Sequence, residues 1–226
     1  MKILSDNDME IRNELITQQL YELVRQYDFS RFNHVFDKKS LPSSGIYLFF
    51  EKGEKITIDN REYDRIVRVG THVKDGNFPG RIRQHYSGNK NGSVFRKHLG
   101  GAIIRKENLD YPRLSDWLKQ KGSTYKDIEE KVSQYLRDNF TFVCFKVTEK
   151  DDRLTLESAL IALLSQYPLG KPSQTWLGRH AFSPIIRYTG LWNTRETDKM
   201  PLDENQLDKI RNYMEEFTKD KGITKK

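Results

Sequence analysis

Ser44-Gly45-Ile46-Tyr47-Leu48-Phe49-Phe50-Glu51 is the first of two stretches that determine the predicted fold. The second is Arg65-Ile66-Val67-Arg68-Val69-Gly70-Thr71. Each is a short run of aromatic and β-branched residues bounded by Gly, Pro or charged residues, which is typical of a strand. Side chains alternate along a strand, so Tyr47 and Phe49 should share one face of the sheet.

The same alternation predicts the faces of the second strand. Val67 and Val69 should share one face, and Arg68 and Gly70 the opposite one. If the two strands pair, Arg68 can lie beside Tyr47 on a face that need not be core.

A third motif follows shortly after the second strand. In Gly80-Arg81-Ile82-Arg83-Gln84-His85-Tyr86, Arg81 and His85 are four positions apart. On a helix, residues at this spacing project from the same side. A tyrosine, two arginines and a histidine on one small surface suit an anionic phosphate.

In this order the motifs resemble a known family. Gly45-Ile46-Tyr47, then Arg68-Val69-Gly70-Thr71, then Arg81 with His85, look like the opening of a GIY-YIG nuclease domain. The resemblance implies an α+β fold with a small three-stranded antiparallel sheet flanked by helices. It also implies cleavage of DNA phosphodiesters with a divalent metal, Mg²⁺ or Mn²⁺. The sequence departs from the family pattern at Arg68, where the family usually has a second tyrosine.

Two later segments extend the comparison. Phe140–Val147 alternates as a third strand with both faces largely apolar, and an apolar helix over 154–167 follows it. Glu157 falls in the first turns of that helix. Spacing alone leaves two roles open, a complement to the helix N-terminus or a metal ligand, and the resemblance implies the ligand. Asn193 resembles the family's late asparagine near the catalytic face, and an ordinary turn residue is the alternative.

The resemblance implies a role for each matching side chain. Glu157 would hold the metal, and Arg81 would clamp the non-bridging phosphate oxygens. Tyr47 would act as base or pass on a proton from water, with His85 accepting that proton or positioning the tyrosine. Arg68 would orient water or stabilise charge. The expected catalytic residues are therefore Tyr47, Arg68, Arg81, His85, Glu157 and Asn193.

Charge also points to a polyanion. The 226 residues carry a net charge of +7, and the segment from Arg61 to Lys106 holds eleven Lys or Arg against three acidic residues. A local positive field of this kind favours double-stranded DNA as the partner. The expected DNA contacts are Arg65, Lys74, Arg83, Lys90, Arg96 and Lys97.

Several classes of protein are disfavoured. No apolar run approaches the ~20 residues of a membrane helix, and the polar N-terminus does not resemble a secretion signal. The single cysteine, Cys144, cannot form an internal disulfide or a cysteine-based zinc site alone. A buried thiol in the reducing cytoplasm is the expectation.

The chain divides into three parts by its patterns. Residues 1–43 should form an N-terminal helical extension, with a helix over about 6–28 that could be a packing arm, a dimer element or a DNA clamp. Residues 44–193 should form the nuclease-like domain, with a possible short strand at 55–58. Ser93 can cap a helix that Gly100-Gly101 should break or end. A helical insertion at about 107–139 should hold helices over 114–121 and 125–137. Residues 194–226 should form a C-terminal helix over about 203–218 and a basic tail.

The leading hypothesis is a stand-alone, sequence-specific restriction-type endonuclease, with a homodimer favoured because both strands of a duplex must be cut. A repair or mobile-element nuclease is an alternative within the same class. A DNA-binding protein without catalysis on a degenerate fold is the alternative from a different class, and a basic structural or RNA-associated protein comes last.

Overall fold

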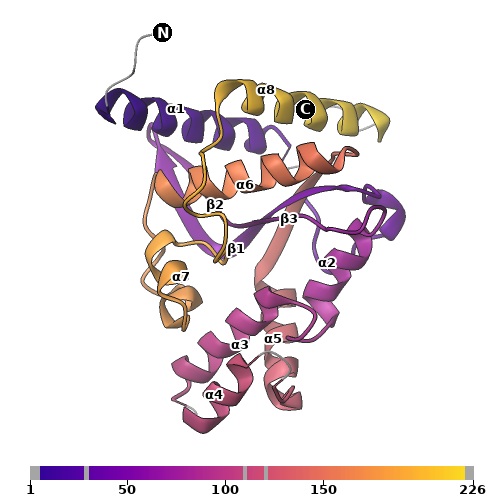
Figure 1. Ribbon diagram of the computed structural model, residues 1–226, viewed down its shortest axis with the longest axis vertical. Coiled ribbons are helices and arrows are strands. Elements are labelled where there is room, and N and C mark those ends of the chain that lie inside the picture. Colours follow the sequence, from indigo (N-terminus) through magenta and orange to yellow (C-terminus); the bar gives the residue numbers. More distant parts are fainter. Residues whose placement is uncertain (1–5, 28–30, 109–110, 120–121, 222–226) are drawn as a thin grey trace.

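The fold is built around a three-stranded antiparallel sheet (Figure 1). The computed structural model describes residues 6–27, 31–108, 111–119 and 122–221. The sheet has the order β2-β1-β3, with β1 spanning Gly45–Ile58, β2 Arg61–Gly70 and β3 Phe140–Lys146. The predicted α+β fold and the predicted antiparallel sheet are confirmed.

The first two strands form one long hairpin. Residues 55–58, which suggested a separate short strand, continue β1 up to the turn. The two turn residues, Asp59 and Asn60, have φ values of 47° and 62°. Two successive residues with positive φ match the right-handed twist of a hairpin, and Asp and Asn tolerate that conformation better than most residues.

An irregularity in β2 corrects one expectation. Phe49 pairs with Arg68 but Phe50 pairs with Ile66, so Val67 is an extra residue on β2. Such a bulge breaks the alternation of side chains. Val67 therefore packs on the same face as Phe49, whereas Val69 packs on the opposite face. The prediction that Val67 and Val69 share a face was wrong, because it assumed strict alternation of side chains and a bulge interrupts that alternation.

Helices cover both faces of the sheet (Figure 1). One face is covered by α1 (Asp6–Arg25), α6 (Lys150–Gln166) and α8 (Glu204–Asp220). The other face is covered by α2 (Phe78–Ser87), α3 (Val94–Lys106) and α5 (Lys126–Asn139), and α4 (Tyr111–Leu118) packs against α3. The shorter elements are the 3₁₀ helices η2 (Lys38–Ser40) and η3 (Leu177–His180) and the helix α7 (Pro184–Thr189).

The sheet separates two apolar cores. Ile46 and Leu48 of β1 pack into the core that contains α1, α6 and α8. Tyr47 and Phe49 point the other way and pack into the core that contains α2, α3 and α5. Tyr47 is thus fully buried, although the sequence pattern left open whether its face of the sheet would be core or solvent-exposed.

The predicted helices over 6–28, 114–121, 125–137, 154–167 and 203–218 are confirmed apart from their ends. Residue 28, residues 120–121 and residues 222–226 of the basic tail lie outside the described residues.

One helix boundary was predicted wrongly. The pair Gly100-Gly101 was expected to break or end the helix that begins after Ser93, but α3 continues through both glycines to Lys106. A Cβ at position 100 would lie 2.2 Å from the Trp117 ring, so the glycine allows α4 to pack closely against α3. Tertiary packing outweighs the low helix propensity of glycine here.

Cys144 is a buried free thiol in β3. Within the described ranges, no helix has the length and apolar character needed to cross a membrane.

Candidate active site

The loop after α7 runs along the free edge of β2 and carries Asn193. The amide of Trp192 donates to Val67 O at 2.7 Å. Farther along, Asn193 Oδ1 accepts from Val69 N at 3.1 Å and its Nδ2 donates to Val69 O at 2.9 Å. An edge strand leaves backbone groups unpaired, and this loop satisfies those of β2.

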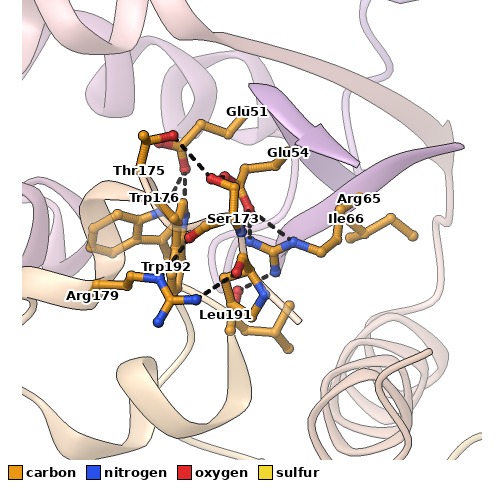
Figure 2. A network of polar contacts seen from close by, with 12 residues as sticks. Glu51, Glu54, Arg65, Ile66, Ser173, Thr175, Trp176, Arg179, Leu191 and Trp192 are labelled. Atoms are coloured by element: carbon orange, nitrogen blue, oxygen red, sulfur yellow. Dashed lines mark hydrogen bonds and ion pairs between the residues drawn. The ribbon is translucent and has the colours of Figure 1, made fainter. Parts of the chain in front are cut away.

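A buried polar network fastens the same segment to β1 (Figure 2). One oxygen of Glu51 accepts from the indole N–H groups of Trp176 and Trp192 at 2.9 and 3.0 Å. Glu54 pairs with Arg65 at 2.6 Å, and Arg65 also donates to Gly190 O at 2.6 Å. These bonds hold residues 173–193 against the hairpin, so they determine where Asn193 lies.

The first and third motifs meet in a direct hydrogen bond. Tyr47 Oη lies 2.8 Å from Nε2 of His85, which α2 presents to the sheet. Tyr47 pairs with Gly70 across the hairpin, and a Cβ at position 70 would lie 2.1 Å from the tyrosine oxygen. The glycine of the second motif therefore makes room for the hydroxyl group of the first.

Arg68 lies beside this pair, on the same face of the sheet. Its Nη1 donates to Trp192 O at 2.7 Å, and its guanidinium stacks over the Phe95 ring with 4.8 Å between Cζ and the ring centroid. Its Nε is buried and has no hydrogen-bond partner in the part of the chain that the structure describes. An unsatisfied charged donor of this kind can bind an incoming oxygen.

Arg81 reaches the same region from α2. Its Nη1 donates to Gly92 O and to Gln84 Oε1, both at 3.1 Å. Burial lowers the pKa of His85 well below its usual value, and the charges of Arg81, Arg68 and Arg96 lower it further. The imidazole is therefore neutral at physiological pH.

Glu157 of α6 joins the site through the end of β2. Its Oε1 accepts a hydrogen bond of 3.0 Å from the backbone N–H of Thr71. Burial raises the pKa of this carboxyl group, although the charges of Arg68 and Arg81 and the bond from Thr71 act in the opposite direction.

The donor set of Glu157 fits a magnesium ion. Its Oε1 accepts the hydrogen bond from Thr71, and no hydrogen bond to its other carboxylate oxygen occurs among the described residues, so that oxygen could coordinate a metal ion. Magnesium keeps several waters and takes one or two carboxylates, so a single glutamate is a suitable anchor. No group of three or more His, Cys, Asp or Glu residues that could hold a metal occurs within the described ranges.

The site is largely enclosed. Tyr47 and His85 are 0% exposed and Asn193 is 5% exposed. Arg81 and Glu157 retain partial exposure. Since the tyrosine oxygen is enclosed in this conformation, a reaction that uses it requires the site to open to water.

The expected DNA contacts divide into two groups. Lys74 and Arg83 are exposed, and Lys97 is half-buried on the surface of α3. Arg65, Lys90 and Arg96 are instead buried and paired within the protein, so they are not available to DNA here. Arg65 pairs with Glu54, Arg96 pairs with Glu129 at 2.7 Å, and Lys90 donates to Lys119 O at 3.1 Å.

Sequence reasoning missed several residues at the site. Ser93 was recognised only as a helix cap, yet its hydroxyl also lies 2.9 Å from Nδ1 of His85. Thr71 belongs to the second motif, but its backbone bond to Glu157 joins residues far apart in sequence. Glu51 gave no signal beyond ending an apolar run.

Two further histidines flank the site. His72, directly after Thr71, is buried, and burial together with Arg153 lowers its pKa to about 4. His98 on α3 is half-buried, and burial together with Arg68 lowers its pKa to about 4. Both rings are therefore neutral near pH 7.

Comparison with known proteins supports one family. A family model described as the GIY-YIG domain matches residues 10–220, a range that includes most of α1 and all of α8. No curated protein and no solved structure matches the chain.

Proposed function

We propose that this chain, which belongs to the GIY-YIG domain family and is thus a nuclease of that superfamily, is a divalent-metal-dependent endonuclease that hydrolyses duplex DNA. One observation carries the proposal. Tyr47 at the start of β1 lies opposite the end of β2, which carries Arg68, and two hydrogen bonds, Tyr47–His85 and Thr71–Glu157, bring α2 and α6 to this place.

Hydrolysis of a phosphodiester requires a nucleophilic water, neutralised charge at phosphorus and a stabilised leaving oxygen. Arg81 and Glu157 are partly exposed, so they would meet the scissile phosphate first. The guanidinium of Arg81 would hold the non-bridging oxygens, for which its planar fork suits better than a lysine ammonium. Tyr47, held by His85, would take the proton of the attacking water.

Glu157 would hold the metal. When bound, Mg²⁺ or Mn²⁺ would polarise the phosphate and stabilise the negative charge of the leaving oxygen. A bound cation would also offset the unfavourable burial of the Glu157 carboxylate, which is the physical cause of its raised pKa.

Arg68 would perform two tasks at the position of the family's second tyrosine. Its bond to Trp192 O would keep the Asn193 loop in place, and Asn193 in turn would fix the end of β2. Its unsatisfied Nε would bind a phosphate oxygen or the attacking water. An arginine can thus supply a donor and a charge where a tyrosine supplies a donor alone.

The cleavage we propose is of the restriction type. Target recognition would come from α3, α4 and α5, and from exposed cations such as Lys74, Arg83 and Lys97. Cutting both strands would be achieved by a homodimer. The lone buried Cys144 is compatible with a cytoplasmic location.

The test is cleavage of a varied pool of duplex DNA by the purified protein with Mg²⁺, with Mn²⁺ and with a chelator. Discrete fragments with shared end sequences, formed only with metal, would support restriction-type cleavage. Fragments with random ends would favour a repair or mobile-element nuclease. Tight binding without cleavage in either metal would overturn the proposed enzyme and favour a DNA-binding protein.

A further inference from the structure

A buried line of polar atoms continues behind the Tyr47–His85 pair. His85 Nε2 lies 2.8 Å from Tyr47 Oη, and His85 Nδ1 lies 2.9 Å from Ser93 Oγ. Ser93 Oγ in turn accepts from the backbone N–H of Arg96 at 3.3 Å, as the N-cap of α3. The three side chains are 0% exposed, so water does not satisfy their donors and acceptors.

Building on the proposed nuclease function, we infer that Ser93 is a positioning residue whose hydroxyl donates to His85 Nδ1. This bond fixes the imidazole proton on Nε2, where it is donated to the Tyr47 oxygen. His85 then stabilises Tyr47 as the proton acceptor of the reaction and is not itself the acceptor.

Counting protons along the line shows that one hydroxyl proton lacks an acceptor whichever way the ring N–H points, and that the direction decides which hydroxyl it is. A neutral imidazole has one N–H, and Ser93 Oγ already accepts from Arg96 N. If the ring N–H pointed at Ser93, the serine proton would have no acceptor among the described residues. If the ring N–H points at Tyr47, Ser93 donates to Nδ1, and the proton without an acceptor among the described residues is that of Tyr47.

The two ends of the line also differ in their surroundings. Ser93 is enclosed at the start of α3, where an unsatisfied hydroxyl proton would be a permanent cost. Tyr47 Oη lies against Gly70, next to Thr71, whose backbone holds Glu157. Any unsatisfied proton of a neutral tyrosine is therefore at the end where substrate and water arrive.

Nearby groups keep the imidazole neutral. Arg68 of β2, Arg81 of α2 and Arg96 of α3 lower the pKa of His85, in addition to burial. On the opposite side, Cys144 of β3 pairs with Tyr47 across the sheet, and burial raises the pKa of its thiol so that it stays protonated. Glu157 of α6 is the acidic group of the site.

The reaction step is balanced by these residues and water. Tyr47 releases its proton to solvent before the attack. The water oxygen then bonds to phosphorus, and the proton of that water passes to the oxygen of Tyr47. The bond from phosphorus to the leaving oxygen breaks, and the leaving oxygen takes a proton from solvent. His85 keeps its own proton throughout.

The test measures which nitrogen carries that proton. Long-range proton–nitrogen NMR on the full chain with ¹⁵N-labelled histidine reports the tautomer of each ring, and His85→Gln assigns the signals. We expect the His85 proton on Nε2. A proton on Nδ1 would overturn the inference, whether or not the protein cleaves DNA, so this failure is distinguishable from failure of the proposed function.

Variants of Ser93 test the consequence. In Ser93→Ala the single tautomer should be lost, single-turnover cleavage at pH 7 should fall about tenfold, and half-maximal cleavage should move to higher pH. Ser93→Thr, which keeps a hydroxyl, should restore tautomer and rate. The matched control is Ser133→Ala, which removes a hydroxyl that also bonds Arg96, at 2.8 Å, without contacting His85. Equal losses in Ser93→Ala and Ser133→Ala would refute the positioning role.

Discussion

Removal of Glu54 should destabilise the protein strongly, because it would leave Arg65 as an unpaired charge in the interior. The two side chains are 4% and 5% exposed and are joined by two hydrogen bonds, of 2.6 and 3.2 Å. Glu54 also accepts from the backbone N–H of Ser173 at 3.2 Å. In Glu54→Met the one hydrogen bond left to the arginine within the described ranges is its bond to Gly190 O.

The magnitude follows from this geometry. Breaking a buried ion pair by removing one partner costs about 3–5 kcal/mol. In a chain of this size each kcal/mol lowers the melting temperature by about 2–4 °C, so Glu54→Met should melt about 6–20 °C lower. Replacing both partners, as in Glu54→Met with Arg65→Met, should cost much less than the sum of the single changes, because no charge is left behind.

The assay is urea unfolding followed by tryptophan fluorescence, since Trp176 and Trp192 lie beside the pair (Figure 2). Glu62→Gln is the matched control on the same hairpin, because Glu62 is 66% exposed in its 3.4 Å pair with Lys55. That exposed pair should contribute about 0–1 kcal/mol. A loss of less than about 1 kcal/mol in Glu54→Met would mean that the Arg65 charge remains solvated, and would exclude a strongly stabilising buried pair.

Three further predictions concern the site and the surface. Gly70→Ala should displace the hydroxyl of Tyr47 and lower the free energy of unfolding by about 1–3 kcal/mol, with cleavage lost more than DNA binding; unchanged cleavage would contradict the close packing of these two residues. Burial raises the pKa of Glu51 in the folded protein. As pH rises above about 4.5, the carboxyl group therefore ionises in the unfolded chain before it does so in the folded one. The wild type loses stability from that pH up to the folded-state pKa. The melting temperature of Glu51→Gln minus that of the wild type should therefore be larger at pH 8 than at pH 4. An equal difference at both pH values would contradict the raised pKa of Glu51. Replacing Arg83 or Lys97 with Gln should weaken DNA binding and reduce the slope of log affinity against log salt by about 1 each, and an unchanged slope would exclude that residue as a phosphate contact.

Local sequence patterns were sufficient for the sheet and most helices. The strands containing Tyr47 and Arg68 carry β-branched and aromatic runs, and the helices show apolar residues at helical spacing. These signals depend only on neighbours in the chain. They also placed Tyr47 and Arg68 on one face, which the register confirms through the pairing of Phe49 with Arg68.

Features that depend on distant residues could not be predicted in this way. The bulge at Val67 is set by pairing with β1, and the continuity of α3 through Gly100 is set by Trp117 on α4. The burial of Arg96 depends on Glu129, which lies on another helix. Ser93 illustrates the same limit within the site, since its cap role is local but its contact with His85 arises only when α2 and α3 pack together.

The role of Glu157 as the metal ligand is tested most directly by comparing the wild type with Glu157→Gln on one cleavable DNA fragment, with binding and cleavage measured side by side. Glutamine keeps the shape of the side chain and can still accept the bond from Thr71, but it removes the charge that would hold the metal. Binding in chelator should be retained, and Mg²⁺-dependent cleavage should fall by a factor of at least about 10². Glu149→Gln, at the exposed N-cap of the same helix, should cleave like the wild type. Cleavage by Glu157→Gln at the wild-type rate would exclude Glu157 as the metal ligand.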